Sequence, residues 1–199
     1  MLKAIFLDRI VFNFNKMDTL TLQAFLVPVI ALILVIVFYI ILLNKTDNKP
    51  AFKQFTFIIL ILAVLLNFAW EMVQMPLYKN MERGMQSTIF CGVASIADGI
   101  MVALLYYSFA FFYKEIYWMH KRKGKRIFAL MIAGGIGAVV AEVRHVSSGS
   151  WSYTEAMPLV PVVNVGLSPV LQFMLLPAII YYLSFRTIKM KPINPKTLK

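Results

Sequence analysis

Residues 22–43 read LQAFLVPVIALILVIVFYIILL, a mainly apolar run without one charged side chain. A membrane-spanning helix needs about 20 such residues, because the hydrocarbon core is roughly 30 Å thick and a helix rises about 1.5 Å per residue. The run therefore reaches the length of a span by itself. No small-residue cleavage site follows it closely, so we expect a retained transmembrane helix rather than a signal peptide.

Four further apolar runs have the same character. Together with the first run, they predict transmembrane helices at residues 22–43, 55–75, 89–113, 127–146 and 165–185. Only 15% of the residues are charged, whereas about a quarter are charged in a soluble domain. The sequence therefore predicts an all-α fold, an integral membrane bundle of about five helices that forms one domain over residues 1–199. Residues 1–18 are expected to lie on the membrane surface or to hang free, and residues 186–199 to form a basic cytoplasmic tail.

Most of the 20 lysine and arginine residues fall on one side of this predicted bundle. With five spans, that side holds the loop after the first span, the loop after the third span and the C-terminal tail. Cytoplasmic loops carry an excess of Lys and Arg, so we predict a cytoplasmic C-terminus and an outside N-terminus in the inner (cytoplasmic) cell membrane. The net charge of +11 then indicates membrane lipids as partners, and no nucleic acid partner is expected.

Four predicted spans carry polar side chains at helical spacing. An ionisable side chain inside a span costs about 2.5–3.5 kcal/mol on insertion scales and is a functional-site hypothesis by default. With the predicted orientation, all four stripes lie in the outer half of the bilayer, so we expect them to meet there. The stripes are Asn67, Glu71, Gln74 and Tyr78; Thr88, Cys91, Ser95 and Asp98; Glu142, Arg144 and His145; and Asn164, Ser168 and Gln172.

The three carboxyl groups of Glu71, Asp98 and Glu142 are the candidate catalytic residues, because a positioned carboxyl group can donate or accept a proton. A magnesium site made of these carboxylates is compatible with the residue types, but nothing in the sequence demands one, and we expect neither a metal nor a cofactor. The candidate substrate-binding residues are Asn67, Trp70, Gln74, Tyr78, Arg144, His145, Trp151, Tyr153 and Gln172.

Each of these features also has a purely structural interpretation. Glu142 and Arg144 lie near a span end, where such side chains extend to the membrane surface. Carboxyl and amide groups such as those of Glu71 and Gln74 also link helices by hydrogen bonds. Trp151 and Tyr153 are typical of the aromatic belt at the interface. Small residues at 133, 137 and 141 recur every four positions, which predicts close helix packing on that face.

Two motifs carry a resemblance. The stretch from Trp70 to Tyr78 reads WEMVQMPLY, and the stretch from Trp151 to Pro158 reads WSYTEAMP. On these residues the chain resembles a group of small uncharacterised bacterial multi-pass membrane proteins, which implies architecture only. The Trp70–Glu71 pair is also similar to one found in some membrane-embedded isomerases and terpene cyclases. There the carboxyl group serves carbocation chemistry.

Three functions therefore remain open. The first is a protein that binds or acts on a lipid or isoprenoid-like apolar molecule in an outer-leaflet pocket, as a cofactor-independent isomerase or cyclase if it is an enzyme. The second is a transporter or proton-coupled accessory protein that uses the same carboxyl groups as relay groups. The third is a structural subunit of a homo-oligomer or a larger membrane complex, in which the polar stripes hold helices together.

Overall fold

The computed structural model describes residues 27–79, 81, 83–119 and 124–187. Within these residues, five helices are long and apolar enough to cross a membrane, which confirms the predicted all-α bundle. Residues 22–26 of the predicted first span, the segment 1–18 and most of the basic tail lie outside the described residues. The helices are Val27–Lys45, α2 (Lys49–Gln74), α3 (Met85–Tyr113), α4 (Gly124–Ser147) and α5 (Leu167–Thr187), and the 3-10 turn η1 (Met75–Leu77) extends α2.

The helices begin at different residues from the apolar runs that predict them. α2 begins at Lys49 rather than near residue 55, because Asn48 caps it. The Asn48 Oδ1 atom accepts a hydrogen bond of 3.1 Å from the Ala51 amide, and Pro50 occupies the first turn. α5 instead begins later than predicted, at Leu167, because the two preceding residues form a strand.

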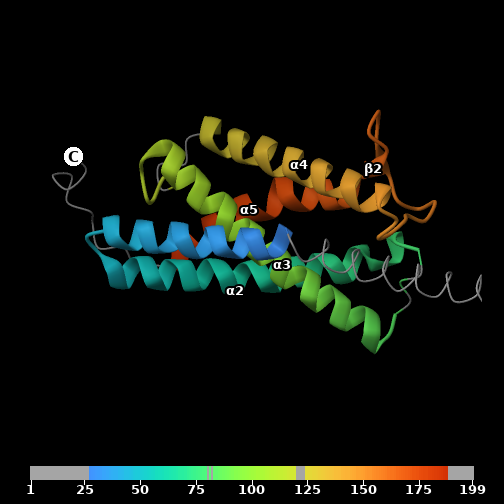
Figure 1. Cartoon of the computed structure of the whole chain (residues 1–199), viewed down its shortest axis with the longest axis horizontal. Helices are drawn as coiled ribbons and strands as arrows, with labels where there is room; N and C mark the ends of the chain where they lie inside the picture. Colours follow the sequence, from blue (N-terminus) through green and yellow to red (C-terminus); the bar gives the residue numbers. More distant parts are fainter. Residues whose placement is uncertain (1–26, 80, 82, 120–123, 188–199) are drawn as a thin grey trace, which may run out of the picture.

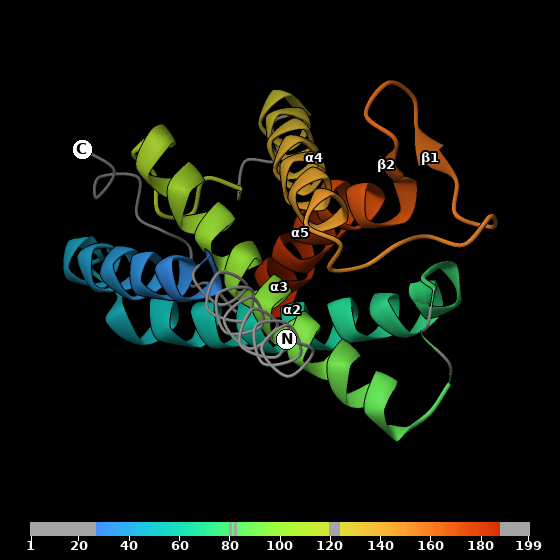
Figure 2. The ribbon, with the colours of Figure 1, turned by 45° about the vertical axis from the view of Figure 1, so that its right-hand side comes forward.

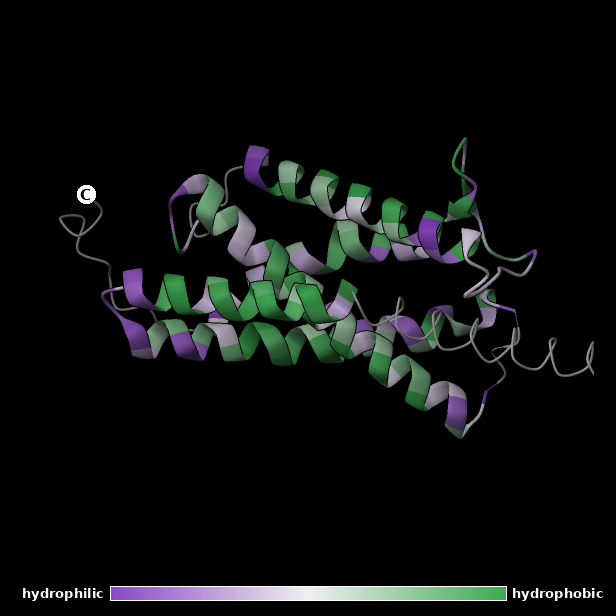
Figure 3. Cartoon of the chain, in the orientation of Figure 1, coloured by the Kyte–Doolittle hydropathy of each residue, from purple (hydrophilic) through white to green (hydrophobic). Residues whose placement is uncertain are grey.

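The bundle consists of two pairs of helices joined through α5. The first helix runs beside α2, and α4 runs beside α5 (Figure 1). α5 packs against both α2 and α4, while α3 packs mainly on α2 and crosses it at an angle (Figure 2). Apolar residues cover the middle of the helices and hydrophilic residues gather at their ends (Figure 3). This distribution is the one expected of helices surrounded by lipid.

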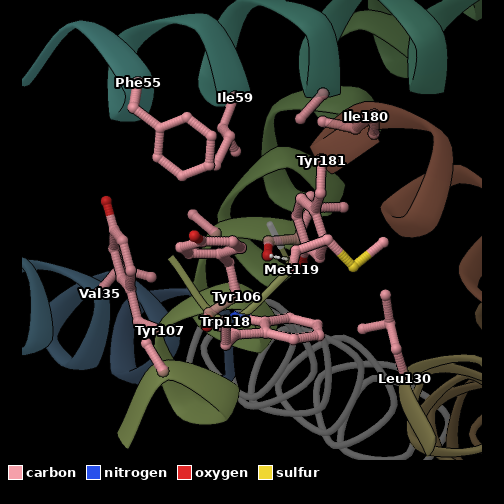
Figure 4. Close-up of a cluster of buried hydrophobic side chains, with 14 of the residues drawn as sticks. Val35, Phe55, Ile59, Tyr106, Tyr107, Trp118, Met119, Leu130, Ile180 and Tyr181 are labelled. Atoms are coloured by element: carbon pink, nitrogen blue, oxygen red, sulfur yellow. Dashed lines mark hydrogen bonds between the residues drawn. The ribbon is translucent and has the colours of Figure 1, made fainter. Parts of the chain in front are cut away.

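An aromatic core fills the end of the bundle where the first helix finishes and α2 begins. The rings of Phe55, Tyr106, Tyr107, Trp118 and Tyr181 are buried against one another (Figure 4). Away from water, their polar atoms need partners within the protein. The hydrogen bonds are Tyr106 OH to Ile116 O at 2.8 Å, Tyr107 OH to Thr56 Oγ1 at 3.1 Å, Tyr181 OH to Val102 O at 2.6 Å and Trp118 Nε1 to Tyr106 O at 3.2 Å.

Two adjacent glycines of α4 allow its close approach to α5. A Cβ atom added at Gly134 would lie 2.1 Å from the Phe173 carbonyl oxygen, and one added at Gly135 would lie 2.9 Å from the Met174 side chain. Gly137 has nothing within 4 Å of such an atom. Among the described residues, the predicted packing face at residues 133, 137 and 141 is therefore not the one that α4 uses against α5. The contact runs along the face that carries Gly134, Gly135 and Ala138, because α4 is rotated to bury it.

The connection between α4 and α5 is ordered by a small antiparallel hairpin. Its strands are β1 (Leu159–Val160) and β2 (Val165–Gly166). Asn164, predicted in the polar stripe of the fifth span, lies instead in the turn between these strands and is exposed. An isolated bridge between Tyr78 and Tyr153 ties the same connection to the segment after α2.

Candidate functional site

Polar side chains from three helices meet near the end of the bundle where α2 and α4 finish and α3 and α5 begin. We call this the polar end; it lies on the right of Figure 1. Its central group is the carboxyl–amide cluster, in which α2, α3 and α5 contribute side chains at helical spacing. The cluster consists of Asn67, Glu71 and Gln74 from α2, Asp98 from α3, and Ser168 and Gln172 from α5.

Gln172 is the centre of this cluster and is buried. Its Nε2 atom donates to Asn67 Oδ1 at 2.8 Å and to Asp98 Oδ2 at 3.0 Å, with Glu71 Oε1 a third acceptor at 3.3 Å. A side-chain amide has only two hydrogens, so the three acceptors share them. One residue of α5 therefore holds both carboxyl groups, which come from two other helices.

Gln74, the last residue of α2, closes the cluster on the side of the helix end. Its Nε2 atom donates to Glu71 Oε1 at 2.8 Å and to Gln172 Oε1 at 3.1 Å. Its Oε1 atom accepts a hydrogen bond of 2.8 Å from Ser168 Oγ. The sequence places Ser168 in a polar stripe but assigns it no role, and its register with Gln172 on α5 is the signal that could have included it.

The carboxyl–amide cluster contains two acidic side chains and no basic one. Glu71 and Asp98 lie half-buried beside each other and bind the same amide. Within the described part of the chain, neither carboxyl group forms an ion pair with a lysine, arginine or histidine. A carboxylate that is taken out of water is normally paired with a base or a metal. A shared proton, or a bound group of complementary charge, would balance such an arrangement.

Glu142 lies outside this cluster, in a second group on α4 and the following loop. Its Oε2 atom accepts a hydrogen bond of 3.2 Å from Trp151 Nε1 and a second bond from the Tyr153 hydroxyl group. The His145 ring stacks on Trp151 at a centroid distance of 4.1 Å. The structure therefore joins four predicted site residues here, but separately from Gln172.

Tyr78 lies between the two groups. Its ring packs edge-on against Trp151 at a centroid distance of 6.2 Å, and it packs at a tilt of 54° against Tyr153 at 5.6 Å. Burial raises the pKa of Tyr78 well above its ordinary value, and negative charge at Glu142, Glu71, Tyr153 and Asp98 raises it further.

The remaining predicted site residues belong to neither group. Arg144 is exposed in the last turn of α4. The indole nitrogen of Trp70 is buried and has no hydrogen-bond partner among the described residues. The hydroxyl groups of the α3 stripe bond to nearby backbone carbonyls. Ser95 Oγ donates to the Cys91 carbonyl at 2.5 Å, and Thr88 Oγ1 donates to the Gly84 carbonyl at 2.9 Å.

The three carboxyl groups do not form a metal site. Over the ranges that the structure describes, no three His, Cys, Asp or Glu side chains gather closely enough to hold a metal ion. The magnesium arrangement that the residue types allow is therefore not formed, because Glu142 binds the aromatic loop while Glu71 and Asp98 bind Gln172.

The fold and this site together define a multi-pass membrane protein with a carboxyl–amide cluster near one end of its helices. No protein-family model, curated protein or solved structure matches the chain. The resemblance carried by the WEMVQMPLY and WSYTEAMP motifs therefore stays a prediction.

Proposed function

We propose that this protein binds and acts on a lipid or isoprenoid-like apolar molecule at the polar end of its helices. The observation that supports this proposal is that the Gln172 amide donates to both Asp98 and Glu71. No basic side chain of the described residues pairs with either carboxyl group. With the orientation that the Lys and Arg distribution predicts, the site lies in the outer leaflet of the inner membrane.

The chemistry proposed for these groups is proton transfer without a cofactor. One carboxyl group, carrying a proton, donates it to a carbon of the substrate double bond. The other, as a carboxylate, removes a proton from a neighbouring carbon. The double bond moves, no electrons are gained or lost, and one proton has passed from one carboxyl group to the other. The rings of Tyr78 and Trp151 lie beside this end and suit the stabilisation of a transient positive charge.

The test is mass spectrometry of small molecules that co-purify with the protein in mild detergent. We expect a distinct apolar molecule with the wild type, and either its loss or its replacement by the unconverted isomer in Asp98→Asn and in Glu71→Gln. Both variants keep an oxygen that accepts the bond from Gln172, so the geometry is preserved while the acidic proton is removed. The control is Glu155→Gln, which changes an exposed carboxyl group in the loop after α4 and should leave the bound molecule unchanged.

The same amount of the same molecule in all four proteins, with normal folding, would contradict the proposal. A molecule identified in this way would then be supplied to purified protein in detergent, and its conversion followed with time. Binding without conversion in the wild type would reduce the proposal from an enzyme to a binding protein.

A second function, that of a structural subunit, is favoured by one observation. Amide and hydroxyl groups of the cluster bond to one another across α2, α3 and α5, as in a link between helices. In that case Asp98→Asn would lower thermal stability or assembly with other chains, and only bulk phospholipid would co-purify with the wild type.

Proton-coupled transport has less support. A relay would need to continue from the carboxyl–amide cluster to the opposite end of the bundle. That end holds the aromatic core, in which the hydroxyl groups of Tyr106 and Tyr181 bond to backbone carbonyls. Ion or proton flux in proteoliposomes that Asp98→Asn abolishes would restore this alternative.

A further inference from the structure

The hairpin between α4 and α5 presents apolar side chains away from the protein. Val162, at its turn, is 96% exposed, and Leu159 and Val163 are 46% and 40% exposed. The sequence from Ala156 to Phe185 contains no charged residue. An exposed apolar segment without nearby charge normally marks a contact with a membrane or another molecule.

The base of the hairpin fixes the direction of this turn. Val165 is buried and belongs to a cluster with Ala138 and Val170, on α4 and α5. A Cβ atom added at Gly166 would lie 3.0 Å from Met157 Sδ and 3.1 Å from Tyr153 Cε1. Because the base is packed this closely, the turn is held outward and cannot bury its valines against the bundle.

The backbone at the turn is also unfavourable for the residue it carries. Val162 has a φ angle of 74°, and a β-branched residue rarely adopts this left-handed conformation. Such a conformation costs on the order of 1–3 kcal/mol and persists only where the surrounding structure imposes it. The exposed valine is thus imposed by the hairpin and is not a local preference of the chain.

The position of the hairpin indicates what covers it. It stands to the side of the end of α4, rather than beyond the helices along their length (Figures 1 and 2). This level is where the spans end and where Tyr78, Trp151 and Tyr153 form an aromatic group typical of the membrane interface. An entirely apolar groove of about 280 Å³ lies along α4 and α5, next to the base of the hairpin. Its lining includes Val139, Val170 and Met174.

We infer that the hairpin inserts its turn into the interfacial layer of the bilayer beside α4, with Leu159, Val162 and Val163 among the lipid acyl chains. The hairpin then acts as a lateral anchor that holds the loop bearing Trp151 and Tyr153 at a fixed depth. This inference does not depend on the proposed enzyme or binding function, because it concerns a surface that the carboxyl–amide cluster does not use.

Spin labelling in lipid nanodiscs tests the insertion. The chain has one cysteine, Cys91, which is buried, so Val162→Cys introduces one accessible thiol. The label at position 162 should collide several-fold more often with oxygen than with a water-soluble nickel complex. Glu155→Cys, an exposed polar position in the same loop, is the control and should show the opposite ratio.

The other outcomes overturn the inference. Collision with the nickel complex at position 162 equal to that at 155 would place the hairpin in water. Protection from both reagents, or dipolar coupling between two labels, would show that a protein or a second copy covers it. If Val162→Cys does not fold, Leu159→Cys provides a second position with a normal backbone angle and the same expected ratio.

Discussion

Gln172 shows how one side chain can organise a site contributed by three helices. It is 1% exposed, and its amide is the common donor for Asn67, Asp98 and Glu71. The residue lies on α5, whereas all three acceptors lie on other helices. Glu71 also accepts a hydrogen bond from Gln74 on its own helix. Among the described residues, however, Gln172 is the only donor to Asn67 Oδ1 and Asp98 Oδ2, so the stability of the polar end depends on this amide.

Gln172→Met keeps the length of the side chain and removes both donor hydrogens. We expect it to destabilise the protein by about 1–3 kcal/mol, because buried acceptors are left without a donor. Heating in detergent with a thiol-reactive dye measures this, since the buried Cys91 reacts only on unfolding. Gln54→Met, at an exposed position of α2, is the control and should behave as the wild type. Equal stability of both variants would contradict the central role of Gln172.

Tyr153 makes the free energy of unfolding depend on pH in alkaline solution. Burial is the main cause that raises the pKa of Tyr153 from its ordinary 10.0 to about 12, and its bond to Glu142 adds to the effect. The folded state therefore holds the phenol proton more tightly than the unfolded state does. The stability this contributes is complete below pH 10 and is lost as the pH rises through about 12.

Tyr153→Phe should reduce this loss of stability in alkali. Unfolding temperatures measured from pH 9 to 12 should fall less steeply for the variant than for the wild type. The dependence should not vanish, because the pKa of Tyr78 is raised in the same direction. An identical slope in both proteins would show that Tyr153 does not retain its proton in the folded state.

At the scale of the element, the contact between α4 and α5 is set by glycine. Gly134→Ala should destabilise the bundle by about 1–3 kcal/mol, because the new methyl group meets the Phe173 backbone and forces the helices apart. Gly137→Ala is the matched control on the same helix. Its methyl group meets nothing within 4 Å, so we expect no loss and a gain of up to roughly 1 kcal/mol. The unfolding temperatures of the two variants, measured under the same conditions, show which face of α4 packs against α5.

At the scale of the whole molecule, the orientation in the membrane is a prediction from charge alone. Asp47 lies between the first helix and α2, and Glu155 lies in the loop at the polar end; both are exposed. A membrane-impermeant maleimide added to intact spheroplasts should label Glu155→Cys and not Asp47→Cys. After lysis both should react. Labelling of Asp47→Cys alone before lysis would reverse the orientation and place the carboxyl–amide cluster in the inner leaflet.

The amino-acid sequence was enough to predict the five spans and the residues of the polar stripes. Helix length follows from the thickness of the bilayer, and the face of a side chain follows from the 3.6-residue period. This was sufficient to group Asn67, Glu71 and Gln74 and to expect Asp98 and Gln172 near them. All five lie in the carboxyl–amide cluster.

The division of the polar stripes between different hydrogen-bond partners could not be predicted in this way and follows from the packing of the helices. The tertiary structure assigned Glu142 to Trp151 and Tyr153 rather than to Gln172, buried Gly134 in place of Gly137, and moved Asn164 from a helix into a turn. These outcomes depend on the rotation and crossing of helices and on the path of a loop. Such quantities are set by the packing of side chains far apart in the sequence, which no local period contains.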